Sequence, residues 1–384
     1  MSFSRVFRRS FCQCAGVATV LLGLSFSAAG ESDVPEDTRQ TKQAKWENMA
    51  ALPYRVQEIY PVVFRNHIVV AGGLSPDVSD RDIDVSNRVV IYNIEKNTWT
   101  EGPKLPEARH HPMLVNAGNR LFAFGGFTVD NEGIWHNSTD ILELTFDCSK
   151  HNCTDNNTSN NKDSDKYKNE NEENIFTHAR WKKVASLPTP LSETLSSVNG
   201  NAVHLVSGRS PKSDTSNSQW IDQIDVDTHL MFNPEKMNST DAEPVPTARN
   251  SACSVTLNDQ MHTIGGRTVS GGNLASHEVY NFTTGKWQVA EPLPEAQGGL
   301  ACATLNGSIY VFGGEYFDNG GGVYSKVWQY SVDSDEWYEV STMPFPRHGL
   351  GAVTIGDSIY VIAGAMEAGG NKTTSMMSRF AVID

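Results

Sequence analysis

The stretch from Lys104 to Gly126 places one arginine and two histidines directly after a Leu-Pro pair. Arg109, His110 and His111 stand in "EARHHPM", ahead of a largely apolar run that ends in two glycines. Histidine titrates near neutral pH and arginine stabilises negative charge, so the three residues have the types that acid–base chemistry needs. A catalytic reading depends on whether the rest of the chain repeats the pattern.

The double-glycine element recurs at intervals of about fifty residues, with one longer interval. The six segments are HIVVAGG, RLFAFGG, AVHLVSGR, QMHTIGG, SIYVFGG and SIYVIAGA. We align the first glycines as Gly72, Gly125, Gly208, Gly265, Gly313 and Gly364, which puts Arg209 in the place of a second glycine. In most units a variable loop, an aromatic strand-type run, a tryptophan and a Leu-Pro or Met-Pro pair follow.

Four short strands separated by turn residues in each unit predict a propeller blade. The glycine pair, Tyr and Trp, recurring in that order, resemble the kelch repeat. The resemblance covers roughly residues 46–384 and implies an all-β, six-bladed kelch β-propeller. Because Trp46 precedes the first unit and the last unit lacks a fourth strand, we expect an N-terminal strand to close the ring.

The first thirty residues have the layout of an export signal. Arg5, Arg8 and Arg9 precede an apolar run and then Ser-Ala-Ala. We expect cleavage, a periplasmic or secreted location and no membrane contact afterwards, with the Sec and twin-arginine routes both open. The predicted organisation is a signal peptide (1–29), a linker (30–44) and the propeller (45–384), with a disordered polar insertion at about 148–178.

The charge and the cysteine content argue against a nucleic-acid-binding protein and against a zinc or redox site. The formal net charge is −14, and an acidic chain without a basic stripe is a poor candidate for binding nucleic acid. Cys148 and Cys153 lie close enough in sequence to pair in an oxidising compartment, whereas Cys253 and Cys302 are expected to be buried free thiols. The chain has no CxxC motif and so no predicted zinc or redox site.

The residues after each Leu-Pro or equivalent pair lead into the next innermost strand, so we expect them to converge at one mouth of the central channel. Glu58, Glu193 and Glu315 depart from the repeat or follow its glycines, and they are the candidate catalytic carboxylates. The expected binding residues are Gln57, Arg109, His110, His111, Arg209, Arg249, Asn250, Arg267, Gln297, Arg347 and His348.

A purely structural role is the alternative for the arginines. An arginine before the innermost strand is common in kelch repeats, where it often bonds nearby loop carbonyls. Arg249 and Arg347 fit that reading as well as the functional one.

One further cluster raises the question of a metal. Asp225, Asp227 and His229 alternate and would share one strand face. The kelch-type specifier proteins of glucosinolate breakdown bind iron through Glu-x3-Asp-x3-His, but Ile221 stands where the first ligand would be. We therefore expect no metal and no cofactor.

Three function classes fit the sequence. Exported kelch mutarotases of sialic acid resemble this chain in architecture, and they imply a sugar-converting site with a glutamate after a glycine, as at Glu315. The second class is a non-catalytic module that binds a glycan or a protein. The third is a copper radical oxidase like galactose oxidase, but no His-Tyr-Cys set is evident. The identity of the ligand and the oligomeric state stay open.

Overall fold

The repeats fold into antiparallel strands, and the second strand of each repeat is the most deeply buried. In the first repeat this strand is β3 (His67–Ala71), and all five of its residues are buried. Its β-branched residues suit a strand that is covered on both faces. The structure, a computed structural model, describes residues 43–79, 83–146 and 176–383, which belong to a unit spanning Thr41–Asp384.

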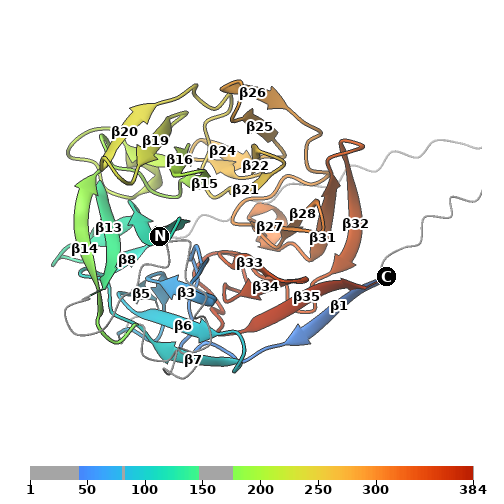
Figure 1. Ribbon diagram of the computed structural model, residues 1–384, viewed down its shortest axis with the longest axis horizontal. Coiled ribbons are helices and arrows are strands. Elements are labelled where there is room, and N and C mark those ends of the chain that lie inside the picture. The colour runs from blue at the N-terminus through green and yellow to red at the C-terminus, as the bar shows by residue number, and fades with distance from the viewer. Residues whose placement is uncertain (1–42, 80–82, 147–175, 384) are drawn as a thin grey trace, which may run out of the picture. The chain divides into compact units, whose positions relative to one another are not determined.

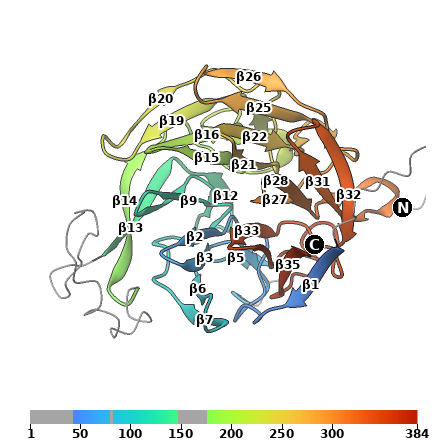
Figure 2. The same ribbon diagram turned by 45° about the vertical axis from the view of Figure 1, so that its right-hand side comes forward.

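The described residues form six four-stranded sheets, called blades 1 to 6 here (Figures 1 and 2). From the innermost strand outward, blade 1 is β2 (Val62–Phe64), β3, β6 (Val89–Asn93) and β7 (Thr98–Glu101). Blade 2 is β9 (Met113–Ala117), β10 (Arg120–Phe124), β13 (Asp140–Phe146) and β14 (Ala179–Ser186). Blade 3 is β15 (Leu195–Asn199), β16 (Ala202–Val206), β19 (His229–Asn233) and β20 (Asn238–Asp241).

Blade 4 is β21 (Cys253–Leu257), β22 (Gln260–Ile264), β25 (His277–Asn281) and β26 (Lys286–Val289). Blade 5 is β27 (Ala301–Leu305), β28 (Ser308–Phe312), β31 (Lys326–Ser331) and β32 (Glu336–Thr342). Blade 6 is β33 (Gly351–Ile355), β34 (Ser358–Ile362), β35 (Met377–Ile383) and β1 (Gln43–Asn48). The innermost strands contact one another in chain order, and β33 contacts β2, so the blades surround a central channel (Figure 1).

Blade 6 combines both ends of the described chain. Strand β1 pairs antiparallel with β35, with Trp46 opposite Phe380. The Trp46 ring lies 5.1 Å from that of Phe380 and 6.0 Å from that of Phe312 in blade 5. The first described strand therefore supplies the outermost strand of the last blade and packs against its neighbour.

Small sheets stand above the blades at one end of the channel, here called the mouth. They are formed by the loops after the glycine pairs, together with one strand that precedes an innermost strand. They are β4 (Leu74–Ser75) with β5 (Asp84–Val85), β8 (Arg109–His110) with β11 (Phe127–Val129) and β12 (Trp135–Asn137), β17 (Arg209–Pro211) with β18 (Gln223–Asp225), β23 (Arg267–Thr268) with β24 (Gly271–Asn273), and β29 (Glu315–Tyr316) with β30 (Gly322–Val323). Two 3-10 turns, Trp220–Asp222 and Asp318–Gly320, lie in these loops.

The glycines let neighbouring blades approach closely. Gly72 and Gly73 have φ of 69° and 94°, and a Cβ on Gly72 would lie 2.1 Å from the carbonyl oxygen of Arg109 in blade 2. The N–H of Gly73 donates to the same oxygen at 2.9 Å. Glycine permits both this backbone conformation and this contact.

The structure corrects the glycine register in two blades. The N–H of Gly208 donates to Arg249 and that of Gly364 to Val56, which is the bond that the second glycine makes elsewhere. Ser207 and Ala363 therefore take the place of the first glycine, with φ of 56° and 52°. Arg209 follows the second glycine rather than replacing it.

The cysteine prediction for the innermost strands was wrong. Cys253 in β21 and Cys302 in β27 form a disulfide between blades 4 and 5, with their Cα atoms 5.8 Å apart. The two strands are neighbours around the channel, and this separation falls within the range that a disulfide spans. Cys148 and Cys153, the predicted signal peptide and most of the predicted insertion lie outside the described residues. Within the described ranges no helix is long and apolar enough to cross a bilayer.

Candidate functional site

One repeat position carries a left-handed backbone in every blade. It is the fifth residue after the Leu-Pro or equivalent pair, with φ between 49° and 71°. Glycine occupies it in blades 5 and 6, and side chains occupy it in blades 1 to 4. These six residues, here called the ring positions, are Glu58, His111, Glu193, Ser251, Gly299 and Gly349.

Backbone hydrogen bonds join neighbouring ring positions across the channel end. The N–H of Glu58 donates to Gly349 at 2.7 Å, and the N–H of Gly349 donates to Gly299 at 2.9 Å. A left-handed conformation costs a residue with a side chain about 1 kcal/mol relative to glycine. Two blades make the same turn with glycine, so the four side chains at ring positions are not required by the fold. Backbone strain of this kind concentrates at functional sites.

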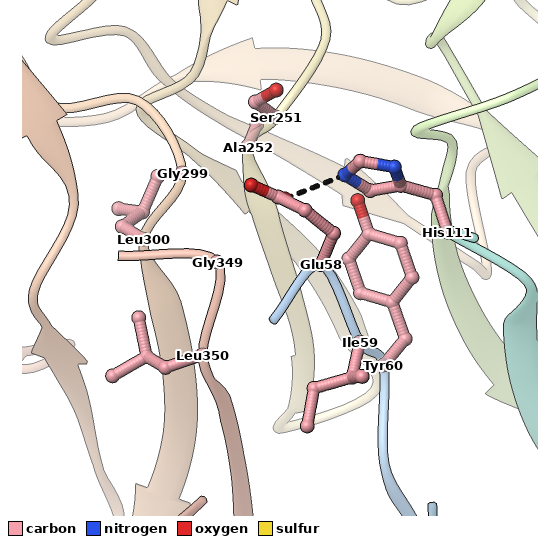
Figure 3. A pocket seen from close by; sticks show the side chains of 10 residues that line it. All are labelled: Glu58, Ile59, Tyr60, His111, Ser251, Ala252, Gly299, Leu300, Gly349 and Leu350. Carbon is pink, nitrogen blue, oxygen red and sulfur yellow. Dashed lines mark hydrogen bonds and ion pairs between the residues drawn. The ribbon is translucent and has the colours of Figure 1, made fainter. Parts of the chain in front are cut away.

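Glu58 and His111 form the first hydrogen-bonded pair of the ring. Oε2 of Glu58 lies 2.7 Å from Nε2 of His111, and Nδ1 of His111 lies 2.8 Å from Nδ1 of His110. In Figure 3 the Tyr60 ring stands beside the pair with its hydroxyl toward both groups. Burial would raise the pKa of Glu58, but His111, His348 and Arg267 hold that pKa below its usual range.

Glu193 is held by two neighbouring blades. Its carboxylate accepts hydrogen bonds from Arg209, on the loop of its own blade, and from the Ser251 hydroxyl of blade 4. Burial would raise the pKa of Glu193, but Arg209, His111 and Arg267 together with the Ser251 hydrogen bond lower it. Burial and the charges of Glu193 and Glu58 raise the pKa of Tyr60 well above its usual value, so Tyr60 keeps its proton.

Glu315 connects blades 4, 5 and 6. It accepts hydrogen bonds from Arg267 at 2.5 Å and from the backbone N–H of Gly369 at 2.8 Å. Nδ1 of His348 lies 3.4 Å from Glu315 and 3.7 Å from Glu58. Nε2 of His348 is near two backbone carbonyls, those of Glu367 and Gly369, and therefore carries a proton.

These groups form one buried acid–base cluster, here called the mouth cluster. Its members are Glu58, His111, Glu193, Arg209, Ser251, Arg267, Glu315 and His348. With neutral histidines, three carboxylates and two guanidiniums leave one negative charge uncompensated. A cavity of about 10 Å³ at the ring positions is lined by Glu58, Tyr60, His111 and Ser251 among others, which is room for one water molecule.

Aromatic side chains cover the arginines on the outer side. The Arg209 guanidinium lies 4.5 Å from the Trp220 ring centre and 4.9 Å from that of Phe127. Arg267 lies 5.5 Å from Trp220 and 5.9 Å from Phe317. Trp220 is 44% exposed and Phe317 is 62% exposed. The mouth thus presents apolar ring faces above a charged cluster.

The arginines that precede the innermost strands, and the equivalent Gln297, form their hydrogen bonds within their own blades. Arg109 donates to the carbonyl of Gly125 and to Ser138 and Asp140 of its own blade. Arg249 bonds Gly265, Thr263, Ser276 and Glu278, while Gln297 donates to Gly313 and Arg347 to Val361. All four side chains are fully buried and point into their own blades, where three of them bond a carbonyl of the glycine turn and Arg347 bonds the second strand, so they do not join the mouth cluster.

The remaining predicted residues support the cluster from the small sheets. Gln57 is buried and pairs through its backbone with Leu74. Asn250 donates to Asp225, and its Oδ1 lies 3.0 Å from the Ser251 hydroxyl oxygen. His110 stacks on Phe127 and touches Trp135. Sequence reasoning missed Tyr60, Trp220 and Ser251, although the repeat register already placed Ser251 at a ring position.

The residues that raised the question of a metal site bond to different partners. Asp225 bonds Asn250 and the N–H of Val269, whereas His229 bonds His204 and the carbonyl of Glu243. In the described parts of the chain no group of three or more His, Cys, Asp or Glu residues is arranged to hold a metal ion. Because Cys253 and Cys302 are bonded to each other, neither is free for a Tyr–Cys crosslink.

The fold and the sequence repeat together define the class of protein. Residues 192–382 match the model described as the KLHDC2/KLHL20/DRC7 Kelch-repeats domain, and residues 61–106 match the Kelch motif. The chain is a member of the kelch-repeat β-propeller proteins.

Two Kelch-like proteins match part of this sequence, and one solved structure has a similar fold. The Kelch-like protein terF of Aspergillus terreus is 28% identical over 126 residues, or 31% of this chain and 27% of terF. The mouse Kelch-like protein 23 is 35% identical over 83 residues, or 21% of this chain and 14% of that protein. The solved structure of YjhT has a TM-score of 0.65 at 15% identity and covers 85% of this chain and 95% of YjhT. This likeness concerns the fold.

Proposed function

We propose that this propeller is exported and binds a small carbohydrate-type ligand at the channel mouth. The observation that carries the proposal is the set of side chains at ring positions, where glycine would be free of strain. Glu58, His111, Glu193 and Ser251 hold left-handed backbones and converge beneath exposed aromatic rings. Aromatic faces bind sugar rings, and guanidiniums bind hydroxyl or carboxylate oxygens.

The exposed residues around the channel mouth, here called the rim, favour a carbohydrate ligand. Trp220 and Phe317 offer ring faces to solvent, and Arg209 and Arg267 lie directly beneath Trp220. The space inside the mouth cluster fits only about one water molecule, so the ligand would rest on the rim, above the ring positions. The resemblance to exported kelch mutarotases makes a sugar acid such as sialic acid the leading candidate.

If the site is catalytic, mutarotation is the reaction that its groups suit. A base removes the proton of the anomeric hydroxyl while an acid protonates the ring oxygen, and the bond between the anomeric carbon and the ring oxygen breaks. The open form rotates and closes by the reverse steps. Glu58, Glu193 and Glu315 are the candidate carboxylates for the base, and His111 is a candidate acid.

A non-catalytic binding module is the second candidate, and a specific observation favours it. Glu193 and Glu315 each already accept two hydrogen bonds, and Glu58 pairs with His111. Carboxylates held in this way order the rim without taking part in proton transfer. A glycan or a protein segment would then bind to the loops around the mouth.

Export has support from two features. The N-terminal residues have the pattern of a signal peptide. The disulfide between Cys253 and Cys302 suits an oxidising compartment, because such bonds are rare where thiols are kept reduced.

The test is a thermal-shift screen of free sugars and sugar acids, followed by anomer-exchange NMR on each hit. We expect a sugar acid to raise the melting temperature and Trp220→Ala to abolish the shift. Val289→Ala is the matched control, because Val289 is also exposed but lies on the outer strand β26. Faster anomer exchange that Glu58→Gln removes supports the mutarotase, and binding without faster exchange supports the binding module. If no sugar binds, the carbohydrate proposal is wrong.

A further inference from the structure

A second cavity lies in the central channel, directly beneath the ring positions. This cavity, here called the channel chamber, has a volume of about 130 Å³, and residues from all six blades line it. Ile59, Ala252, Leu300 and Leu350 each follow a ring position directly, and they line both this chamber and the small cavity at the ring positions. The chamber therefore begins one residue below the mouth cluster.

The ring positions separate the chamber from the mouth. The backbone N–H of Glu58 donates to Gly349, and that of Gly349 donates to Gly299. The cavity at this level is about 10 Å³, which admits one water molecule. The other ends of the innermost strands are more open, since β15 is buried at Leu195 and exposed at Asn199. A larger molecule would therefore reach the chamber from the end opposite the mouth.

The chamber wall differs from the mouth cluster in its chemistry. Among the described residues that line the chamber, none has a charged side chain, and most are Ile, Leu, Met or Ala. Tyr60 directs its hydroxyl away from the chamber, toward Glu58 and His111 (Figure 3). A charged molecule in this chamber would lose its hydration without gaining an oppositely charged side chain, which is costly. The wall therefore favours an uncharged molecule.

Backbone groups supply the polar part of the wall. The innermost strand of each blade has one edge without a strand partner, so N–H and C=O groups of that edge face the channel. Side chains satisfy some of them. The Ser254 hydroxyl accepts from the N–H of Ser196 at 3.1 Å and donates to its carbonyl at 2.8 Å, and the Thr354 hydroxyl donates to the carbonyl of Thr304. The other edge groups need a water molecule or a ligand hydroxyl as partner.

We propose that the channel chamber binds a small uncharged amphiphile, such as a phenol or a short-chain alcohol. Its apolar part lies beneath the ring positions, against Ile59, Leu300 and Leu350, and its hydroxyl bonds the edge of an innermost strand. An apolar cavity of about 150 Å³ holds one benzene molecule, so the chamber has room for a ligand of this size. The site is separate from the mouth and does not rest on the proposed function.

The experiment is NMR of the full chain with ¹³C-labelled methionine methyl groups, titrated with phenol. Met113 lines the chamber, and Met113→Leu identifies its signal. We expect phenol to shift the Met113 signal to saturation, because the bound ring lies near the methyl group. Benzoate and benzylamine have the same ring and carry a charge, so they should leave the signal unchanged. No shift with phenol, or an equal shift with either charged compound, overturns the proposal.

A variant that fills the chamber tests the location of the site. Ala352 lines the chamber and is partly exposed, so Ala352→Phe should abolish the response of Met113 to phenol. Val289→Phe is the matched control, because it adds the same ring to an exposed position on the outer strand β26 and should keep the response. A response that survives in Ala352→Phe overturns the location. The titration of the unaltered protein needs no variant, so a failure of Ala352→Phe to fold leaves the proposal testable. Sugar binding is measured separately by thermal shift, and its outcome decides the proposed function alone.

Discussion

The Glu58 carboxylate and the His111 imidazole are 53 residues apart in the chain and lie 2.7 Å from each other across the boundary between blades 1 and 2. Both occupy the same position of their repeats, so the ring brings them together rather than any local motif. The three residues of "RHH" therefore differ in what they contact. Arg109 bonds the glycine turn of its own blade, and the two histidines extend from the mouth cluster into an aromatic pocket.

Replacing Ser251 separates backbone strain from hydrogen bonding. Ser251→Ala loses the bond to Glu193 and keeps the left-handed backbone, whereas Ser251→Gly loses the bond and relieves the backbone. We expect the glycine variant to be more stable than the alanine variant by about 1 kcal/mol. Urea unfolding of both variants measures the difference, and equal stabilities would mean that the ring position carries no strain.

The reverse change at Gly349 provides a second comparison. A Cβ there would lie 2.8 Å from Oε1 of Glu58 on a backbone with φ of 56°. Gly349→Ala should therefore destabilise the protein by about 1 kcal/mol or more and displace Glu58 from His111. The displacement is measured by the histidine NMR signals. An alanine variant with unchanged stability and unchanged signals would contradict the contact.

Arg249 should matter for stability and not for ligand binding. It is fully buried and paired with Glu278, away from the mouth cluster. Arg249→Met leaves a buried carboxylate without its partner, and we expect a loss of about 3 kcal/mol in the free energy of unfolding. Any sugar that binds the unaltered protein should bind the folded variant with the same affinity. Arg267→Met is the matched comparison at the mouth, and it should weaken binding.

Two buried histidine pairs should make the propeller sensitive to acid. Nδ1 of His204 lies 2.9 Å from Nε2 of His229, and Nδ1 of His262 lies 2.9 Å from Nε2 of His277. Burial lowers the pKa of His204 and of His277 to about 4, and burial together with His277 lowers that of His262 to about 3. The unfolded chain titrates near 6.5.

These pKa values determine the direction in which stability changes with pH. Between pH 6.5 and about 4 the unfolded state binds more protons than the folded state, so stability is complete above 6.5 and falls as the pH drops. We expect urea unfolding to give at least about 2 kcal/mol less stability at pH 5 than at pH 7. Blade 5 has Tyr310 and Val327 at the places of His262 and His277, so His262→Tyr with His277→Val is a matched control that should be less sensitive. An identical pH dependence in that variant would exclude this pair as the cause.

The disulfide should contribute measurably to the ring. It closes a loop with a sequence separation of 49, and restricting the unfolded chain in this way stabilises by about 2–4 kcal/mol. The double variant Cys253→Ser, Cys302→Ser should lose this amount in urea unfolding. Reductant should have the same effect on the unaltered protein and none on the double variant.

The repeat made the architecture predictable, because each unit carries its glycines, tyrosine and tryptophan in order. The register errors at Gly208 and Gly364 arose because Ser207 and Ala363 adopt the left-handed conformation that the repeat pattern assigns to the first glycine. The convergence of Glu58, Glu193 and His111 also followed from the register.

Other parts of the site depended on side-chain direction. Arg109, Arg249 and Arg347 share the register of the site, but the turn directs their side chains into their own blades. Trp220 reaches Arg267 in the next blade from a loop whose path no repeat specifies. The spacing of Cys253 and Cys302 is close to one repeat, and that was the available sign that the two thiols meet on neighbouring innermost strands.

The disulfide between Cys253 and Cys302 closes a covalent loop that contains all of blade 4. From Cys253 the chain runs through the remaining strands of blade 4, enters blade 5 and returns through Cys302 to its starting point. A protease that cuts the loop between Thr268 and Gly271 would leave one molecule rather than two fragments until a reductant is added. New chain ends placed in that loop would likewise stay tethered, which makes blade 4 a suitable place to open the ring by circular permutation.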